Sequence, residues 1–566
     1  MMILKALYDY YHRMGSLPPQ GMEGKEIAYV IVIDAEGRFL RFESKRIDKK
    51  RSTTFIVPKS VKRTSAPMPN TLWDNGKYVL GLDSTHEQYY RVFVDRVKEI
   101  ADFAPHDPSV RALRLFYEQP REEMLSQMSA DPLFEEIKTN LGANISFQLN
   151  GDDRLIAEKY DIFPPADEHS DNTPEGICLI TGQYGPIVRL NTSVFISDLN
   201  SPTALVNFQT KRGYDSYGKT QSYNAPISEE AEFAYSSALK HLLRSDSQNK
   251  NKAYLGGRTI LFWGSSKAFA QVEEGMIDFF EKKDNPNEKV KRIEKLLKSI
   301  WSGQIKTLLD DRFYVLGLAP NAGRIAVVTW GDMSLKEFAG NLLRHFDDMD
   351  ISSPRPVAGI YSMLATVTLG GKISDVQPSL VEAVVSAVMF GTPYPFALYT
   401  AALERIRADL PSNRVSPARV AILKAYINRQ NKHNKNTIPL TPMLDKDFDN
   451  IGYLCGRLAA VLEKIQEDIK RGDSIRTRYL SAASATPGAV FPAMLNLSIH
   501  HSENLSEPSR IFYQKLEQEI FSKLPSEGFP AQLNLQDQGR FFVGYYQQRE
   551  NLFTKKETAD TNDLNA

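Results

Sequence analysis

The spacing of apolar and polar positions changes along the chain near residue 335. Between 143 and 335, short apolar runs are bounded by turn-forming residues, which is typical of strands. From 335 onward, apolar residues recur every three or four positions, as they do on one face of an amphipathic helix. The pattern therefore predicts a multidomain α+β protein, in which a mixed α/β N-terminal region is followed by an all-α C-terminal helical bundle.

The predicted elements fall into four segments, 1–142, 143–335, 336–442 and 443–566. The first segment is predicted to contain a helix over 3–14, a β-hairpin with its turn at 34–37, and a mostly helical stretch over 87–140. Pro67 and Pro69 argue against both a helix and a central strand, so we expect an extended loop over 64–77.

The second segment is predicted to be rich in strands, and the third and fourth to be helical. The predicted strands are 144–149, 177–181, 187–190, 203–208, 259–264, 313–318 and 324–330. Helices are predicted over 228–243, 286–303, 334–346, 379–391, 396–410, 450–470, 508–524 and 535–552. The polar interval 428–436 is interpreted as a loop or linker.

The composition is that of an ordinary globular chain, and its formal net charge is zero. Any nucleic-acid binding must therefore come from local basic patches. Cys178 and Cys455, the two cysteines, are too few and too far apart for a disulfide framework or a zinc site, which favours a reducing compartment. Without a signal-peptide pattern or a stretch of ~18 apolar residues, we expect a cytoplasmic protein with no membrane partner.

Residues 213–220 match the spacing of a phosphate-binding loop, in which Gly213 is followed after four residues by Gly218, Lys219 and Thr220. Such a loop follows a buried strand and runs directly into a helix. Residues 204–208 qualify as the strand, but Pro226 would fall within the first two helical turns. The helix is instead predicted to begin after Ser228 as N-cap. A P-loop ATPase that uses 213–220 is therefore kept only as an alternative.

Motifs for catalysis or metal binding are missing from the sequence. The histidines are scattered, HExxH and CxxC do not occur, and neighbouring carboxylates such as Asp310 and Asp311 lack a supporting motif. We therefore predict no catalytic residue, no metal site and no cofactor.

Two segments combine cations, amides and aromatic rings, which is the chemistry of a nucleic-acid contact. The candidates in the first are Lys59, Lys62, Arg63, Asn70, Asn75 and Lys77. Those in the second are Lys211, Arg212, Ser216, Lys219, Gln221 and Asn224, interleaved with Tyr214, Tyr217 and Tyr223. Ordinary surface loops, the first with Trp73 in the core, explain the same compositions. Arg476 and Arg478 give a weaker signal in the C-terminal bundle, which solvation of a helix end also explains.

Ordered blocks over nearly the whole chain resemble one known family, the large subunit of the type I-C (Dvulg subtype) CRISPR surveillance complex, Cascade. The blocks include MILKALYDYY, VPKSVKRTSAPMPNTLWDNGKYVLG, SYGKTQSYNAPISEEAEFAYSSALKHLL, FYVLGLAPNAGRIAVVTW and FPAQLNLQDQGRFFVGYYQQRENLFTKKE. The family's loop is similar to SYGK-x-Q-x-x-NAP, so Thr220 need not be a magnesium ligand.

The resemblance implies a non-catalytic subunit that recognises a protospacer-adjacent motif in double-stranded DNA and promotes R-loop formation, so that guide RNA pairs with the target strand. Its implied partners are target DNA and the displaced strand, the guide RNA ribonucleoprotein with its backbone, guide-end-capping and small subunits, and a recruited helicase-nuclease. The resemblance also implies separate production of the C-terminal helical part by internal translation, for which Met443 is the candidate start.

Lys219, Gln221 and Asn224 are the first candidates for contacts with the motif, from their chemistry and their place in the loop. A scaffold that binds single-stranded DNA without reading a motif is the second alternative.

Overall fold

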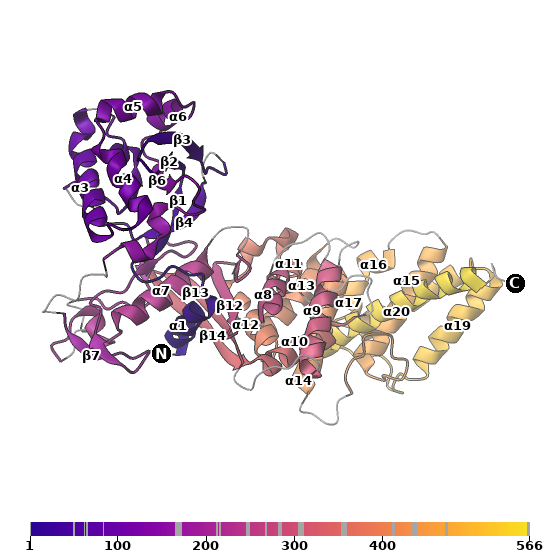
Figure 1. The fold of residues 1–566 in the computed structure, drawn as a ribbon. Helices are drawn as coiled ribbons and strands as arrows, with labels where there is room; N and C mark the ends of the chain where they lie inside the picture. The colour runs from indigo at the N-terminus through magenta and orange to yellow at the C-terminus, as the bar shows by residue number, and fades with distance from the viewer. Residues whose placement is uncertain are drawn as a thin grey trace. The chain divides into compact units, whose positions relative to one another are not determined.

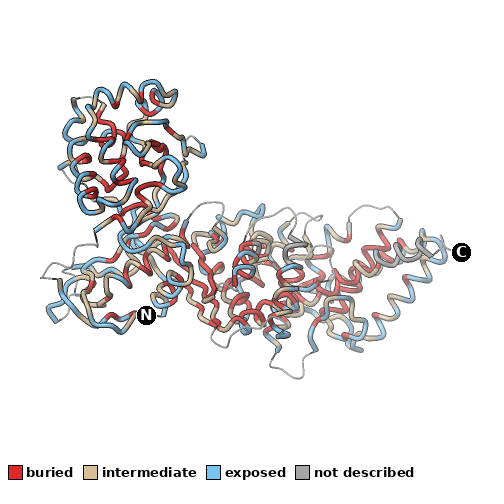
Figure 2. The backbone as a smooth tube through the Cα atoms, in the orientation of Figure 1, coloured by how far each residue is buried: buried red, intermediate tan, exposed pale blue. Residues whose placement is uncertain are grey.

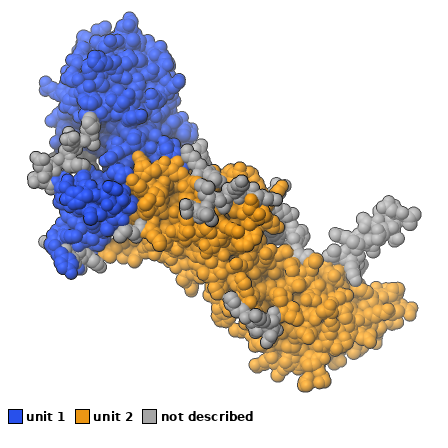
Figure 3. All heavy atoms as spheres, turned by 60° about the horizontal axis from the view of Figure 1, so that its bottom comes forward, with its two compact units in different colours: residues 1, 14–191, 207–238 blue, residues 2–13, 192–206, 239–566 orange. Residues whose placement is uncertain are grey.

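The computed structural model describes residues 2–48, 51–61, 63, 66–82, 84–164, 173–210, 213, 217–244, 249–266, 269–280, 286–303, 311–351, 359–409, 414–432, 438–469 and 474–562 (Figure 1). The chain folds into two compact units (Figure 3). Unit 1 comprises residues 14–191 and 207–238, and unit 2 comprises residues 2–13, 192–206 and 239–566. The α+β class is confirmed, with a helical C-terminal region, whereas the four predicted segments stay a prediction.

A four-stranded mixed sheet forms the centre of unit 1, in the order β3-β2-β6-β5. Its strands are β2 (Tyr29–Ile33), β3 (Phe39–Ser44), β5 (Trp73–Asn75) and β6 (Asn144–Leu149). β2 runs parallel to β6 and antiparallel to β3. Every residue of β2 is buried, as expected for a strand with neighbours on both sides and a continuous apolar sequence.

Helices and two smaller antiparallel pairs complete unit 1. The helices are α2 (Gly76–Val79), α3 (Glu87–Phe103), α4 (Pro108–Glu118), α5 (Arg121–Ser129), α6 (Phe134–Thr139) and the first part of α7 (Glu229–Leu243). The pairs are β1 (Met22–Ile27) with β4 (Thr53–Pro58), and β7 (Glu175–Ile177) with β8 (Tyr184–Pro186). Phe93, Phe116 and Phe147 join α3 and α4 to the sheet, with ring centroids 6.0–6.3 Å apart.

The predicted hairpin is confirmed as the β2–β3 pair. Gly37 has a φ of 77°, a left-handed conformation, and its N–H donates to the Asp34 carbonyl at 3.1 Å. A Cβ atom at this position would also overlap the backbone of α4, so the turn needs glycine for two reasons.

The predicted extended loop over 64–77 is wrong at its C-terminal end. Residues 73–75 form β5, which pairs with β6 at the edge of the sheet, and α2 follows directly. The two prolines precede this strand, so they do not interrupt its hydrogen bonds. Trp73 is buried and donates its indole N–H to the Pro58 carbonyl at 2.8 Å. The indole thus anchors the segment in the core.

Three predicted strands of the second segment are shorter or displaced in the structure. Strands β7 and β8 replace 177–181, and only Thr203–Ala204 (β10) of 203–208 pairs, with Ser193–Val194 (β9). Residues 187–190 form a single bridge, between Ile187 and Ser228. Short apolar runs indicate burial without fixing a strand partner, which accounts for the error.

Unit 2 begins with an antiparallel sheet in the order β11-β12-β13-β14. Its strands are β11 (Lys252–Leu255), β12 (Arg258–Gly264), β13 (Arg312–Asn321) and β14 (Arg324–Ser334). The N-terminal helix α1 (Met2–Met14) packs here, because Tyr10 lies 6.4 Å from the Trp263 ring and Arg13 pairs with Glu273 at 3.1 Å. The first residues of the chain therefore belong to unit 2.

Apart from the β9–β10 pair, the rest of unit 2 is mainly helical, with a core that runs from the sheet to the C-terminal helices (Figure 2). The helices are α8 (Ala270–Met276), α9 (Pro286–Trp301), α10 (Leu335–Met349), α11 (Ile360–Thr366), α12 (Pro378–Met389), α13 (Phe396–Ala408), α14 (Pro417–Asn431), α15 (Ile451–Asp468), α16 (Ser474–Arg478), α17 (Leu480–Ala483), α18 (Pro487–Ser502), α19 (Glu507–Phe521) and α20 (Leu535–Asn562). All the helices predicted from 334 onward are present, with ends shifted by a few residues except at α20, which continues to Asn562.

Glycines allow α15 and α20 to approach each other at backbone distance. A Cβ atom on Gly456 would overlap the carbonyl oxygen of Phe541, and one on Gly452 would overlap that of Asp537. Beside them, Arg457 is fully buried and donates to Glu519 at 2.8 Å and Gln548 at 3.0 Å. The pair of helices is therefore fixed by close packing and by a satisfied buried charge.

Replacement of Gly456 by alanine should lower the free energy of unfolding of unit 2 by roughly 2–3 kcal/mol, because an overpacked core must separate the helices. Urea denaturation followed by circular dichroism measures the loss. Gly142→Ala is the control, since a Cβ atom there meets nothing within 4 Å and its φ is not positive. Equal denaturation midpoints for the two variants would contradict the packing argument.

Candidate nucleic-acid interface

The contact segment comprises residues 217–224, the described end of the second candidate loop. Its residues 217–220, among them Lys219 and Thr220, are exposed, and it ends in a single 3₁₀ turn, η4 (Gln221–Asn224). Tyr217 and Gln221 have φ values of 52° and 51°, in the left-handed region that non-glycine residues rarely adopt. Such a backbone persists only where surrounding contacts hold it.

A chain of buried hydrogen bonds links the turn to helix α7. The Tyr235 hydroxyl on α7 donates to Asn191 Oδ1 at 2.7 Å, and Asn191 Nδ2 donates to Ser222 Oγ at 2.8 Å. All three residues are buried, with Tyr235 only 1% exposed. Burial raises the pKa of Tyr235 far above its ordinary value, so the hydroxyl remains a neutral donor. The turn is thereby tied to a helix.

The side chain of Asn224 bonds to the backbone of the contact segment. Its Nδ2 donates to the carbonyl oxygens of Lys219 at 3.2 Å and Gln221 at 2.9 Å. The side chain therefore serves the backbone of the contact segment, and its predicted contact with DNA stays a prediction.

Main-chain hydrogen bonds hold the two residues Pro226 and Ile227, which lie between the contact segment and α7. Leu179 N–H donates to the Pro226 carbonyl, and Val188 N–H donates to that of Ile227. Ser228 Oγ then accepts from the Ala231 N–H at 3.3 Å, which confirms the predicted N-cap.

This geometry does not fit a phosphate-binding loop. Only Thr203–Ala204 of the required strand forms, and the next α-helix begins at Glu229. The free N–H groups of a helix N-terminus are thus not presented after Thr220.

The candidates of the first segment divide into structural and exposed side chains. Asn70 is buried and accepts from the Val61 N–H at 3.0 Å. Asn75 caps α2 by accepting from the Lys77 N–H at 3.1 Å. Arg63 pairs with the carboxylate of Asp74 and lies 4.2 Å from the centre of the Tyr78 ring.

Arg63 stabilises the charged form of the buried Asp74 carboxylate. Burial raises the pKa of this carboxyl group, whereas Arg63 and the backbone N–H groups of Asn70 and Asn75 lower it. The described cations left exposed in this segment without a carboxylate partner are Lys59 and Lys77.

Other predicted residues are placed as follows. Lys62, Lys211, Arg212 and Ser216 lie outside the described residues. Arg476 is partly buried, with Nε 3.8 Å from Glu463, and Arg478 is exposed on α16. The structure therefore does not bring the arginines of α16 into unit 1, where the other candidates lie.

One residue of the interface was missed by sequence reasoning. Arg189 is exposed, and its Nη1 donates to Gln221 Oε1 at 3.0 Å, while its carbonyl accepts from the Ser222 N–H at 3.2 Å. It occupies an apolar run that was interpreted as a strand, and nothing in the local sequence distinguishes it.

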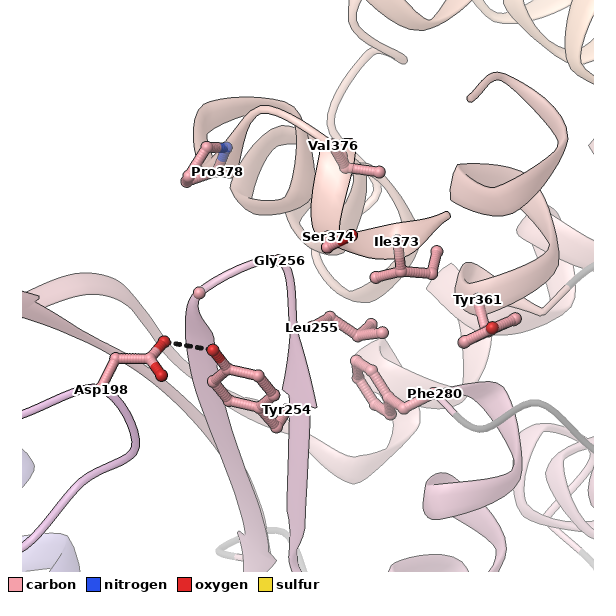
Figure 4. Close-up of a pocket in the computed structure, with 11 residues that line it drawn as sticks. Asp198, Tyr254, Leu255, Gly256, Phe280, Tyr361, Ile373, Ser374, Val376 and Pro378 are labelled. Carbon is pink, nitrogen blue, oxygen red and sulfur yellow. Dashed lines mark hydrogen bonds between the residues drawn. The ribbon is translucent and has the colours of Figure 1, made fainter. Parts of the chain in front are cut away.

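A cavity of about 690 Å³ lies in unit 2, between the β11–β12 turn and the segment that precedes α12 (Figure 4). Its lining is mainly apolar, and the Tyr254 hydroxyl donates to the Asp198 carboxylate. Burial and Asp198 raise the pKa of Tyr254 to about 12. The lining thus includes one carboxylate and neither lysine nor arginine, which makes it a poor surface for phosphates.

Neither a metal-binding cluster nor a membrane-spanning segment is found in the described part of the chain. Within it, no three His, Cys, Asp or Glu side chains are grouped to hold a metal ion. Likewise, none of its helices has the length and apolar character needed to cross a bilayer.

A family model described as "CRISPR-associated protein (Cas_Csd1)" matches residues 7–553. The chain belongs to the Cas_Csd1 family of CRISPR-associated proteins. Membership implies a component of a Cascade ribonucleoprotein complex and agrees with the resemblance found in the sequence. No curated protein sequence matches the chain.

Replacing Tyr235 by phenylalanine should loosen the contact segment, because Asn191 Oδ1 is left buried without its donor, at a cost of about 1–2 kcal/mol. Local opening should then increase roughly 5- to 30-fold. The rate of tryptic cleavage after Lys219, followed by mass spectrometry, measures this opening. Tyr184→Phe is the control, because Tyr184 is 70% exposed. An unchanged cleavage rate in Tyr235→Phe would show that the hydrogen-bond chain does not hold the segment.

Proposed function

We propose that this Cas_Csd1 protein is the non-catalytic large subunit of a type I-C surveillance complex, and that unit 1 reads a short protospacer-adjacent motif in duplex DNA. The observation that carries the proposal is Lys219, an exposed cation two residues before a turn that buried hydrogen bonds hold at Ser222. A fixed turn lowers the entropy lost when the segment binds.

The charges of unit 1 support this choice of segment. Arg46, Arg51 and Lys45 in the basic stretch before β4 pair with Glu136, Asp48 and Glu43, respectively. Lys219, by contrast, has no carboxylate partner among the described residues. Cations that are not neutralised within the protein are available to phosphates.

The contact segment and the two exposed lysines of the first segment are assigned different tasks. Lys59 and Lys77 neutralise backbone phosphates and set the register of the duplex. Lys219 and Gln221 reach base edges of the motif. Lys62, Lys211, Arg212 and Ser216 extend this surface in the proposal, and Arg476 and Arg478 serve the displaced strand.

After the motif is bound, the duplex opens and guide RNA pairs with the target strand. The partners of the chain in this proposal are the guide RNA, the backbone, guide-end-capping and small subunits, and the helicase-nuclease recruited afterwards. We do not propose hydrolysis by the chain itself. A phosphate-binding loop runs directly into an α-helix, whereas Thr220 is followed by the 3₁₀ turn η4, and the next α-helix begins at Glu229.

Replacing Lys219 by alanine should weaken binding of the assembled complex to a motif-containing duplex by about tenfold, the effect of one or two lost polar contacts. Gel-shift titrations with and without the motif measure it. Lys98→Ala is a matched control, because Lys98 is an exposed lysine of unit 1 on α3. Unchanged motif binding in Lys219→Ala would refute the role of the contact segment.

The same titrations separate the alternatives. Equal affinity of the wild-type complex for duplexes with and without the motif would favour a motif-independent scaffold for single-stranded DNA. ATP turnover by the isolated chain, abolished by Lys219→Ala, would favour an ATPase.

We further propose that Met443 starts a separately translated C-terminal product. Met443 is 67% exposed and lies outside regular structure, eight residues before α15 begins at Ile451. The segment that follows holds the α15–α20 pair with its glycine contacts and the buried Arg457, which would give the product internal packing.

Expression of the single gene should yield a second product of residues 443–566, which disappears when Met443 is changed to leucine. Intact mass spectrometry of the purified complex identifies the product by its N-terminus. Met68→Leu, at an exposed methionine outside this segment, should leave the product unchanged. Persistence of the product in Met443→Leu would exclude this residue as the start.

A further inference from the structure

The side chain of Gln221 is oriented by Arg189. A guanidinium group has N–H donors and no acceptor, so the amide oxygen of Gln221 must face it. The 3.0 Å bond from Arg189 Nη1 to Gln221 Oε1 satisfies this requirement. The Nε2 group of Gln221 is then directed away from Arg189, and an exposed guanidinium lies beside it.

The backbone at Gln221 is held in place by hydrogen bonds on both sides of the residue. Gln221 has a φ of 51°, and its carbonyl accepts from Asn224 Nδ2 at 2.9 Å. The next residue, Ser222, is bonded through its N–H to the Arg189 carbonyl and through its hydroxyl to Asn191. Arg189 is thus bonded to Gln221 through its side chain and to Ser222 through its carbonyl, and Ser222 is in turn bonded to the buried Asn191.

This orientation changes what Gln221 can recognise. A free glutamine reads adenine with two bonds, because its oxygen accepts from N6 and its nitrogen donates to N7. Arg189 takes up one acceptor site of Oε1 and adds its own N–H groups, so donors predominate on the outward face of the pair. A pair of donors matches the two acceptors O6 and N7 of guanine, and a single donor matches O4 of thymine. Adenine offers the acceptor N7, but its N6 amino group is a donor and opposes the second donor of the pair.

We infer that Arg189 is a specificity-determining residue, which fixes Gln221 as a hydrogen-bond donor so that the pair selects guanine or thymine, and rejects adenine, at one position of the motif. The inference deepens the proposed function and rests on it. It assigns Arg189 a positioning role through Gln221.

The test is a selection by the assembled complex from duplexes that carry a guide-matched target next to randomised base pairs. The wild-type complex should enrich guanine or thymine at one position by about tenfold over adenine, the scale of one well-formed base contact. Arg189→Ala should release the amide and raise the share of adenine at that position only. Arg189→Lys, which keeps a donor next to Oε1, should restore most of the wild-type profile. Gln221→Met should abolish the preference there.

Two controls separate this inference from misfolding and from failure of the proposed function. Arg111→Ala removes an exposed arginine on α4 of unit 1 and should leave the selected profile unchanged. Each variant should still bind a guide-complementary single strand, which needs no motif. A wild-type selection without any enriched base overturns the proposed function and this inference with it. A selected motif that is identical in wild type and Arg189→Ala, or a wild-type preference for adenine at the Gln221-dependent position, overturns this inference alone.

Discussion

The hydrogen-bond chain from Tyr235 through Asn191 to Ser222 is the interaction on which the proposed interface depends. The contact segment has one 3₁₀ turn and no strand partner, so its own backbone bonds cannot fix it. Its left-handed residues at Tyr217 and Gln221 would relax in a free loop. Because the chain of bonds is buried and satisfied, it transmits the rigidity of α7 to the exposed residues.

This support gives the amides and the cations of the region separate tasks. The amide side chains bond to other residues of the protein and stabilise the loops, as Asn70, Asn75, Asn191 and Asn224 show. Lys219, and in the first segment Lys59 and Lys77, remain exposed without carboxylate partners in the described part of the chain. The contact segment thus combines a held turn with a lysine that has no carboxylate partner among the described residues, although the net charge of the whole chain is zero.

Sequence reasoning succeeded where periodicity or capping chemistry was strong and failed where tertiary contacts decided the outcome. It predicted six of the helices after residue 334, strand 144–149, the hairpin turn and the N-cap at Ser228. It did not predict α11, α14 or α18, and α14 extends to Asn431, into the interval 428–436 that was interpreted as a loop or linker. It misjudged 73–77, because the pairing of β5 with β6 at the edge of the sheet is a tertiary property. Arg189 could not be found, because its partner Gln221 is 32 positions away. The pairing of Arg63 with the buried carboxylate of Asp74 likewise has no sequence signal.

The central claim is that the contact segment lies on the motif in the bound complex. A photo-crosslinking amino acid at Tyr217, which is 100% exposed, tests this contact directly. We expect crosslinks from position 217 to the motif base pairs of a target duplex, and none of comparable yield from position 184 or on a duplex without the motif. Crosslinks that map away from the motif, or that form equally on both duplexes, would contradict it.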